Sequence, residues 1–300
     1  MEDSKIINVE TIAEYNKMVN HETLHPLVSV VDFSKSDIIC QYTRTFGFYT
    51  VFLKDVMCGD MHYGKNNYDY QEGTLVFIAP GQTNGIVNDG SSIRPAGYAL
   101  LFHPDLIRGT ALGKNMKDYS FFSYDVHEAL HLSEREREII LDCFSNIKLE
   151  LEQSIDKHSK SLIVNNIELF LNYCIRFYDR QFVTRDHINQ GVIKKFESLL
   201  NEYLKSEKPK TLGFPMVNYF AEELNLSANY FGDLIKKELG ISAQEFIHNQ
   251  LIEVAKERIF DPGKSISEVS YDLGFKYPQH FTRLFKNKMG ISPSEYKILN

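Results

Sequence analysis

Two short stretches near the C-terminus carry side chains that can recognise DNA. In the second stretch Gln279 and Arg283 lie four residues apart, so they share one face of a helix. Arginine and glutamine pair specifically with the edges of guanine and adenine in the major groove. Pro278 and Thr282 hold the neighbouring outward positions. All four residues are therefore candidates for base contacts.

The first stretch lies fifty residues upstream and has Asn229 and Asp233 at the corresponding positions. Asparagine can pair with adenine, whereas an aspartate at best accepts a hydrogen bond from cytosine. The first stretch is therefore predicted to read fewer bases than the second. Phosphate contacts position a protein on DNA without specifying a sequence. The residues predicted to make them are Lys236, Lys237, Lys286, Lys288 and Ser227, and Ser227 is also predicted to cap its helix.

These candidate residues belong to a segment that occurs twice, within residues 217–299. Gly-Ile-Ser at 240–242 recurs at 290–292, and the apolar positions before it recur at the same distance. Each copy predicts a short helix, a tight turn and a second helix. The predicted helices span 215–224 and 228–239 in the first copy, and 266–273 and 278–289 in the second. This pattern is typical of helix-turn-helix proteins that bind DNA.

One long helix is predicted between the copies, over residues 243–260. Ser242 with Glu245 forms a capping box that begins it, and Ser265 with Glu268 begins the second copy in the same way. At 1.5 Å per residue the connecting helix is about 27 Å long. Such a spacer can hold two reading helices about 34 Å apart, which is one turn of DNA.

Residues 27–102 favour a β domain. Stretches rich in β-branched and aromatic residues alternate with turns near Gly64, Gly73 and Pro80. The predicted strands are 28–33, 48–53, 74–79 and 97–102. Short strands at this spacing favour a small antiparallel barrel or sandwich. An aromatic stretch, 119–124, is predicted to be a further strand or a lid.

Two helices are predicted after the strands, over 133–155 and 158–182. The second carries apolar residues spaced by threes and fours: Leu162, Ile163, Ile167, Phe170, Leu171, Cys174, Ile175 and Tyr178. This stripe is wide enough to pack on the strands and on a second copy of the chain, which predicts a homodimer through the helix at 158–182. The alternative is that the whole stripe packs within its own domain.

Residues 183–187 are a predicted linker, so the predicted domains are 1–182 and 188–300. The second domain is predicted to begin with a helix over 191–205, followed by an interrupted loop over 206–215.

Aromatic side chains on the predicted strands can enclose a small molecule. The residues predicted to line this effector pocket are Phe48, Phe52, Met61, His62, Phe77 and Tyr98. Such a cavity suits a small apolar or aromatic effector with a few polar anchors. The alternative is a filled interior that binds no ligand. His62 has no second histidine two residues on and no histidine follows Pro80-Gly81, so neither a metal site nor a cofactor is predicted.

Charge and cysteine content limit the classes of protein that fit. Residues 185–300 carry 16 lysines and arginines against 15 aspartates and glutamates, whereas the whole chain has a net charge of −7. The front part is therefore acidic, and DNA binding is expected only from the placement of charges in the back part. The four cysteines form no CxxC pair, which favours buried thiols in a reducing compartment. With no signal-peptide pattern and no long apolar run, a cytoplasmic location is expected.

The segment from Ile266 to Tyr296 resembles the signature of AraC/XylS-type transcription regulators. It contains Leu-Gly-Phe at 273–275, Tyr-Pro-Gln at 277–279 and Gly-Ile-Ser-Pro at 290–293. The resemblance extends from about residue 191 to the end of the chain. It implies a bipartite DNA-binding domain whose two helix-turn-helix units enter successive major grooves. It also implies an N-terminal cupin-like barrel that senses a small molecule and carries helices for dimerisation. Gly232 and Asp233 depart from the family's pattern.

The sequence thus predicts an α+β protein of two domains. The first is a cupin-like antiparallel β-barrel with flanking helices, and the second is an all-α domain of two helix-turn-helix units joined by a long helix. The predicted function is transcription regulation without enzymatic activity, with double-stranded DNA and RNA polymerase as partners. One alternative is a cupin-type metalloenzyme with a DNA-binding tail, which the missing metal ligands disfavour. Another is a DNA-binding regulator without a small-molecule ligand.

Overall fold

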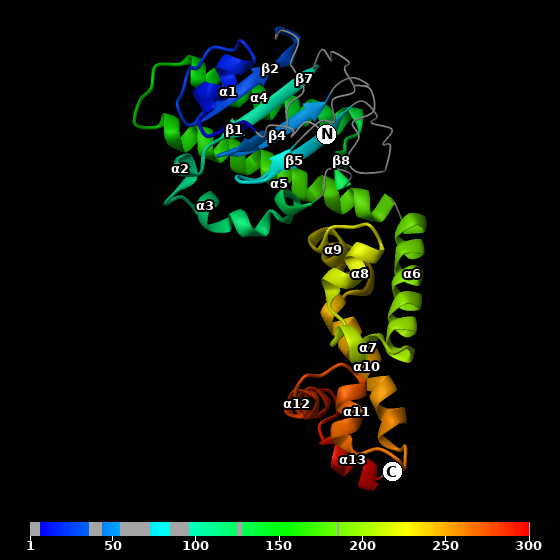
Figure 1. Ribbon diagram of the computed structural model, residues 1–300. Helices are drawn as coiled ribbons and strands as arrows, with labels where there is room; N and C mark the ends of the chain where they lie inside the picture. The colour runs from blue at the N-terminus through cyan, green and yellow to red at the C-terminus, as the bar shows by residue number, and fades with distance from the viewer. Residues whose placement is uncertain are drawn as a thin grey trace, which may run out of the picture. The chain divides into compact units, whose positions relative to one another are not determined.

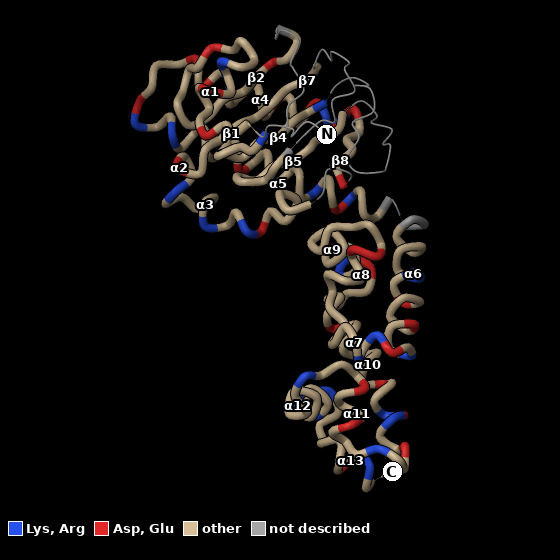
Figure 2. Tube along the Cα trace, viewed as in Figure 1, with Lys and Arg blue, Asp and Glu red and all other residues tan. Residues whose placement is uncertain are grey.

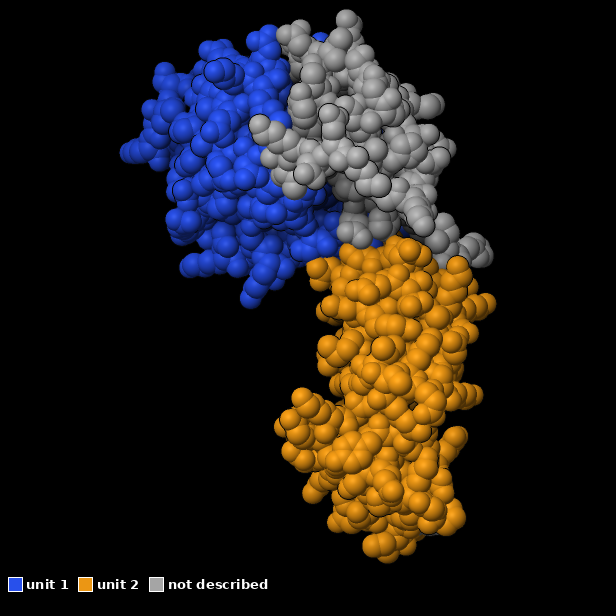
Figure 3. Space-filling view, in the orientation of Figure 1, with its two compact units in different colours: residues 1–184 blue, residues 185–300 orange. Residues whose placement is uncertain are grey.

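The chain forms two compact units, residues 1–184 and residues 185–300 (Figure 3). A computed structural model describes residues 7–35, 44–54, 73–84, 96–124, 128–184 and 186–299. The first unit combines two sheets with several helices, and the second is entirely helical in its described residues (Figure 1). The protein is therefore of mixed α and β structure, with the helix-turn-helix segments in the second unit.

Five strands of the first unit form an antiparallel sheet in the order β2-β7-β4-β5-β8. Their bounds are Val28–Asp32 (β2), Tyr49–Lys54 (β4), Thr74–Ile78 (β5), Gly97–Phe102 (β7) and Leu130–His131 (β8). The four longer strands are those expected from the β-branched and aromatic runs. Every neighbouring pair in this sheet is antiparallel, as predicted.

A smaller sheet has the order β1-β3-β6, with bounds Ile7–Val9 (β1), Arg44–Phe46 (β3) and Thr83–Asn84 (β6). Its first pair is parallel, in contrast to the wholly antiparallel prediction. A parallel pair needs a long connection, and α1 (Ile12–Met18) and β2 lie between these two strands. The strand pairs of the described residues do not close into a barrel, so the cupin-like barrel stays a prediction.

The two faces of the five-stranded sheet bury different partners. On one face, apolar residues pack with the smaller sheet and α1; they include Tyr15, Phe46, Phe48, Val76, Ile78, Ala99 and Leu101. On the other face the ring of Phe77 lies 4.4 Å from that of Phe121 and 6.1 Å from that of Tyr178. Side chains alternate across a strand, so both faces of this sheet are buried by successive residues.

Several short helices connect the sheet to two long ones. The short elements are η1 (Phe33–Lys35), α2 (Pro104–Ile107), α3 (Ala111–Asn115), η2 (Met116–Asp118) and η3 (Ser120–Ser123). The prediction of a strand or lid at 119–124 was wrong, because these residues form a 3-10 helix whose Phe121 and Phe122 are buried. The long helices are α4 (Glu134–Glu152), which starts at a capping box formed by Ser133 and Glu136, and α5 (Ser159–Thr184).

The second unit consists of eight helices in its described residues: α6 (Asp186–Lys205), α7 (Lys208–Leu212), α8 (Val217–Glu223), α9 (Ala228–Leu239), α10 (Ala243–Ile259), α11 (Ile266–Asp272), α12 (Pro278–Met289) and α13 (Pro293–Leu299). The short α7 lies where the sequence predicted only an interrupted loop. Phe196 of α6 packs against Phe220, Phe231 and Phe246, so one ring joins α6 to three other helices. Among the described helices none is long and apolar enough to cross a membrane.

Two of the four cysteines, Cys143 of α4 and Cys174 of α5, are buried and form no disulfide. Burial raises the pKa of Cys143 to about 11 and that of Cys174 well above its ordinary value. Both thiols are therefore protonated at neutral pH and unreactive. Cys40 and Cys58 lie outside the described residues.

Candidate nucleic-acid interface

The second helix of each helix-turn-helix unit begins and ends at well-defined residues. α9 begins after Ser227, whose hydroxyl accepts a hydrogen bond from the Tyr230 amide at 3.2 Å. α12 begins with Pro278 at its first turn, where a missing amide hydrogen costs nothing. The C-terminal caps are Gly240 and Gly290 at φ of 72° and 78°. Both glycines adopt the left-handed conformation that ends a helix without steric strain.

The outer face of α12 carries the side chains predicted to read bases. Gln279 and Arg283 are exposed, and Pro278 and Thr282 are partly exposed. On the opposite face Phe281 and Phe285 are fully buried. The buried rings fix the orientation of the helix, and the four predicted residues consequently lie together on its open side.

The outer face of α9 is different in composition although its packing is the same. Phe231, Leu234 and Ile235 are buried on its inner face. Asn229 is exposed, and Asp233 is partly exposed one turn later. The anionic side chain therefore lies on the outward face, where α12 has an arginine. This arrangement limits the bases that α9 can read.

The four predicted phosphate-contacting lysines, Lys236, Lys237, Lys286 and Lys288, are exposed near the C-terminal ends of α9 and α12. Lys288 also forms an ion pair with Glu245 of α10 at 2.9 Å. Glu245 was predicted to complete a capping box with Ser242, but only the Ser242 hydroxyl contributes to that cap. The Lys288 ammonium must leave this ion pair before it can bind a phosphate. Figure 2 shows basic and acidic positions intermixed along the second unit, with basic positions on α12.

The predicted effector-pocket residues do not lie on one face of the sheet. Phe48 is fully buried in the core that includes α1, and Phe52 packs against the same core. Phe77 pairs with Val51, and Tyr98 with Leu53, in the strand register, which places both on the opposite face. These four rings therefore cannot line a single cavity, because the sheet separates them. Met61 and His62 lie outside the described residues.

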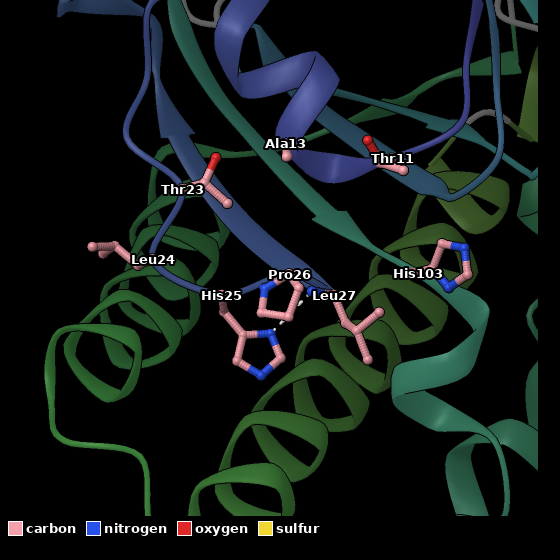
Figure 4. A pocket seen from close by; sticks show the side chains of 8 residues that line it. All are labelled: Thr11, Ala13, Thr23, Leu24, His25, Pro26, Leu27 and His103. Carbon is pink, nitrogen blue, oxygen red and sulfur yellow. Dashed lines mark hydrogen bonds between the residues drawn. The ribbon is translucent and has the colours of Figure 1, made fainter.

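An open pocket of about 500 Å³ lies elsewhere in the first unit (Figure 4). Its lining residues are Thr11, Ala13, Thr23, Leu24, His25, Pro26, Leu27 and His103. The Nδ1 atom of His25 accepts a hydrogen bond from the Leu27 amide, and that of His103 accepts one from the Asp105 amide. Burial lowers the pKa of His25. No local sequence pattern predicts this pocket, because it brings together the segments 11–13 and 23–27 with residue 103.

No group of three or more histidine, cysteine or acidic residues in the described part of the chain could hold a metal ion. His62, the histidine considered as a metal ligand, lies outside that part.

Most of the apolar stripe that was predicted for dimerisation on helix α5 is buried. Six of its residues are buried within their own unit: Ile163, Ile167, Phe170, Leu171, Cys174 and Tyr178. Leu162 and Ile175 are exposed by 45% and 37%, and Leu169 by 47%. The stripe therefore packs mainly within its own unit. Leu162 and Leu169, one heptad apart, form a short outward apolar line, whereas Ile175 lies about 140° away around the helix.

Comparison with known proteins identifies the class of the second unit. Residues 220–297 match a family model described as a helix-turn-helix domain. An uncharacterized HTH-type transcriptional regulator of Bacillus subtilis, YfiF, is 28% identical over 47% of this chain and 41% of its own length. The Msm operon regulatory protein of Streptococcus mutans is 33% identical over 27% of this chain and 29% of its own length. The chain thus spans less than half the length of these two curated relatives.

Among solved structures, a transcriptional regulator with an AraC-type DNA-binding domain from Chromobacterium violaceum is 21% identical. The similarity covers 36% of this chain and 91% of that one, with a TM-score of 0.32. Residues 220–297 of this chain accordingly form a helix-turn-helix domain.

Proposed function

We propose that this chain is a sequence-specific DNA-binding regulator of transcription and not an enzyme. The observation that carries the proposal is the exposed pair Gln279 and Arg283 on α12, which the buried rings of Phe281 and Phe285 hold outwards. Glutamine and arginine side chains that lie one helical turn apart on the same face suit adenine and guanine edges in a major groove. The relatives named above are regulators of transcription, which supports the same assignment.

The proposed reading is unequal between the two helix-turn-helix units. The α12 face provides base contacts, and the α9 face provides at most Asn229 together with phosphate contacts from Lys236 and Lys237. Transcription is then controlled by where the protein sits relative to RNA polymerase on the same DNA.

The experiment is a selection of binding sites from random double-stranded DNA with the full-length chain. We expect an enriched motif, and binding to it that exceeds binding to a scrambled duplex by about a thousandfold or more at fixed salt. Equal affinity for selected and scrambled duplexes would show a non-specific binder and overturn the proposal.

The first unit is proposed to act as a sensor and as a dimerisation domain. A cupin-like barrel in this unit would hold a small apolar or aromatic effector among the aromatic side chains of its strands. Dimerisation is assigned to the outward apolar line of α5, with Leu162 and Leu169 one heptad apart. An effector can regulate DNA binding only if it binds two states of the protein with different affinity. A thermal-shift screen of small aromatic compounds, followed by DNA binding with each hit, tests this part.

A further inference from the structure

We propose that a set of contacts around Gly213 and Gly274 clamps the two helix-turn-helix units into one rigid body, and that this clamp restricts the protein to DNA sites of a single half-site spacing. The inference rests on the proposed DNA-binding function for its consequence, although the clamp itself is a property of the fold. Its members are the glycine pair, Arg258 of α10 and the ion pairs of Asp272.

The first contact is between two backbone segments. Gly213 follows α7 in the first half of the unit, and Gly274 lies in the turn between α11 and α12. A Cβ atom added to Gly274 would lie 2.5 Å from the carbonyl carbon of Gly213 and 2.8 Å from the amide nitrogen of Phe214. Gly274 also has a φ of 88°. Only glycine allows this approach, because any side chain would push the two segments apart.

The segment around Gly213 is itself fixed from other helices. The Tyr203 hydroxyl of α6 donates a hydrogen bond to the Gly213 carbonyl at 3.0 Å. The ring of Phe214 lies 5.0 Å from that of Phe275 in the second turn and 5.8 Å from that of His248 in α10. The glycine contact is therefore backed by α6 on one side and α10 on the other.

Arg258 joins the ends of three helices. Its Nη1 atom donates to the carbonyl of Asp272 at 3.0 Å, and its Nη2 atom donates to the carbonyl of Leu204. These carbonyls lie in the last turns of α11 and α6, where helix carbonyls lack partners and negative partial charge accumulates. The guanidinium of Arg258, near the end of α10, thus links α6 in the first half of the unit to α11 in the second half.

Asp272 adds charged contacts at the same place. Its carboxylate lies 2.5 Å from Lys264 and 3.5 Å from Lys210 of α7. Burial acts to raise the pKa of this carboxyl, but the two lysines outweigh burial and lower it. The carboxylate is thus ionised at neutral pH and bridges α7 to α11.

These contacts fix the position of α12 relative to α9, which a connecting helix alone would leave variable. If only α10 linked the units, bending at its ends would let α12 shift relative to α9. With α6, α7, α10 and α11 joined at one point, the separation of the two reading helices is fixed. Each added base pair moves a half-site by about 3.4 Å along DNA, so a rigid pair of helices tolerates one spacing only.

The test compares Gly274→Ala with Gly290→Ala in the full-length chain. Both glycines have positive φ, 88° and 78°, but a Cβ at Gly290 meets no atom within 4 Å. Spin labels on encoded p-acetylphenylalanine at Lys236 and Lys286 report the separation of α9 and α12. We expect G274A, and independently Asp272→Asn, to widen or shift the distance distribution by about 3 Å or more, the rise of one base pair. An unchanged distribution in folded G274A and in D272N overturns the clamp.

Site selection provides the functional readout. Wild type and G290A should enrich one half-site spacing and prefer it about tenfold or more over a spacing changed by one base pair, the cost of a typical mismatch. G274A should bind both spacings to within about threefold while keeping the same half-site bases. A single sharp spacing in G274A and D272N contradicts the inference. If wild type enriches no motif, the proposed function fails, and the label distances still decide whether the clamp exists.

Discussion

Arg283 and Gln279 lie on successive turns of α12 and are exposed, while the helix is anchored by two buried phenylalanines. Replacing either with alanine removes a bidentate contact and leaves the helix in place. We expect a loss of preference at one or two base pairs of the selected site, worth about 1–3 kcal/mol for each residue. Competition between the selected site and its single-base variants, at one salt concentration, measures this loss.

The control for these variants is Lys286→Ala. This exposed lysine is predicted to contact a phosphate, so its loss should weaken binding to every sequence alike and reduce the salt dependence by about one unit of slope. Should R283A and Q279A behave like K286A, α12 would position the domain without reading bases.

The repeat supplies a matched pair of residues for a second prediction. Asn229 and Gln279 hold the same position on α9 and α12, but the next outward residue is Asp233 in one helix and Arg283 in the other. Asn229→Ala is expected to change base preference less than Gln279→Ala, because α9 lacks a cation that pairs with guanine. Site selection with both variants measures the difference. Equal losses would mean that both units read DNA to the same extent.

At the residue scale, helical spacing alone predicted which side chains of α12 face outwards. With 3.6 residues per turn, Gln279 and Arg283 lie on a different face from Phe281. Spacing could not reveal the Lys288–Glu245 ion pair, because these residues are 43 positions apart and meet only through packing of α10 on α12. The division of the effector-pocket residues between two faces was missed for a related reason. Strand register depends on partners far along the chain, and a shift of one residue exchanges the faces.

At the scale of elements, boundaries with chemical signals were predicted well. α9, with its Ser227 cap, and α12, with Pro278 at its start, each followed by a glycine C-cap, begin and end at the predicted residues. α7 and η3 were not predicted, since short helices depend on tertiary contacts more than on local propensity. The strand pair β1–β3 was missed because no local pattern specifies a parallel partner.

Helix α5 provides a prediction about association. Leu169 is 47% exposed on the outward apolar line, seven residues after Leu162. Leu169→Lys should disrupt packing between two copies of α5 and raise the dissociation constant of the proposed dimer about tenfold or more. Sedimentation velocity over a concentration series measures it. The matched control is Ile298→Lys on α13, where an isoleucine is 83% exposed; if both variants or neither dissociate the dimer, α5 is not the interface.

At the scale of the whole molecule, the two units divide the charge. The first carries the negative balance of the chain, and the second, with 16 basic against 15 acidic residues, is near neutral. An acidic first unit is repelled by DNA, which leaves the interaction to the second unit. Affinity there depends on local placement of lysines and arginines, so it should fall steeply as salt concentration rises.

Histidine 248 makes the stability of the second unit depend on pH. His248 lies in α10, and its ring packs beside that of Phe214. Burial, followed by the nearby charge of Lys288, lowers the pKa of His248 from the ordinary value of 6.5, while Glu245 acts in the opposite direction. The unfolded chain therefore binds a proton at a higher pH than the folded chain does. Stability is complete above pH 6.5 and decreases as pH falls through the lowered folded-state value.

Removing this titration should flatten the pH dependence. In His248→Gln, the decrease in melting temperature of the second unit between pH 7.5 and pH 5.5 should be smaller than in wild type, because no proton is taken up at this site on unfolding. Differential scanning calorimetry of the full-length chain measures both transitions. His280→Gln, at an exposed histidine of α12, is the control and should leave the wild-type dependence in place. An equal acid-induced decrease in H248Q and wild type would exclude His248 as its origin.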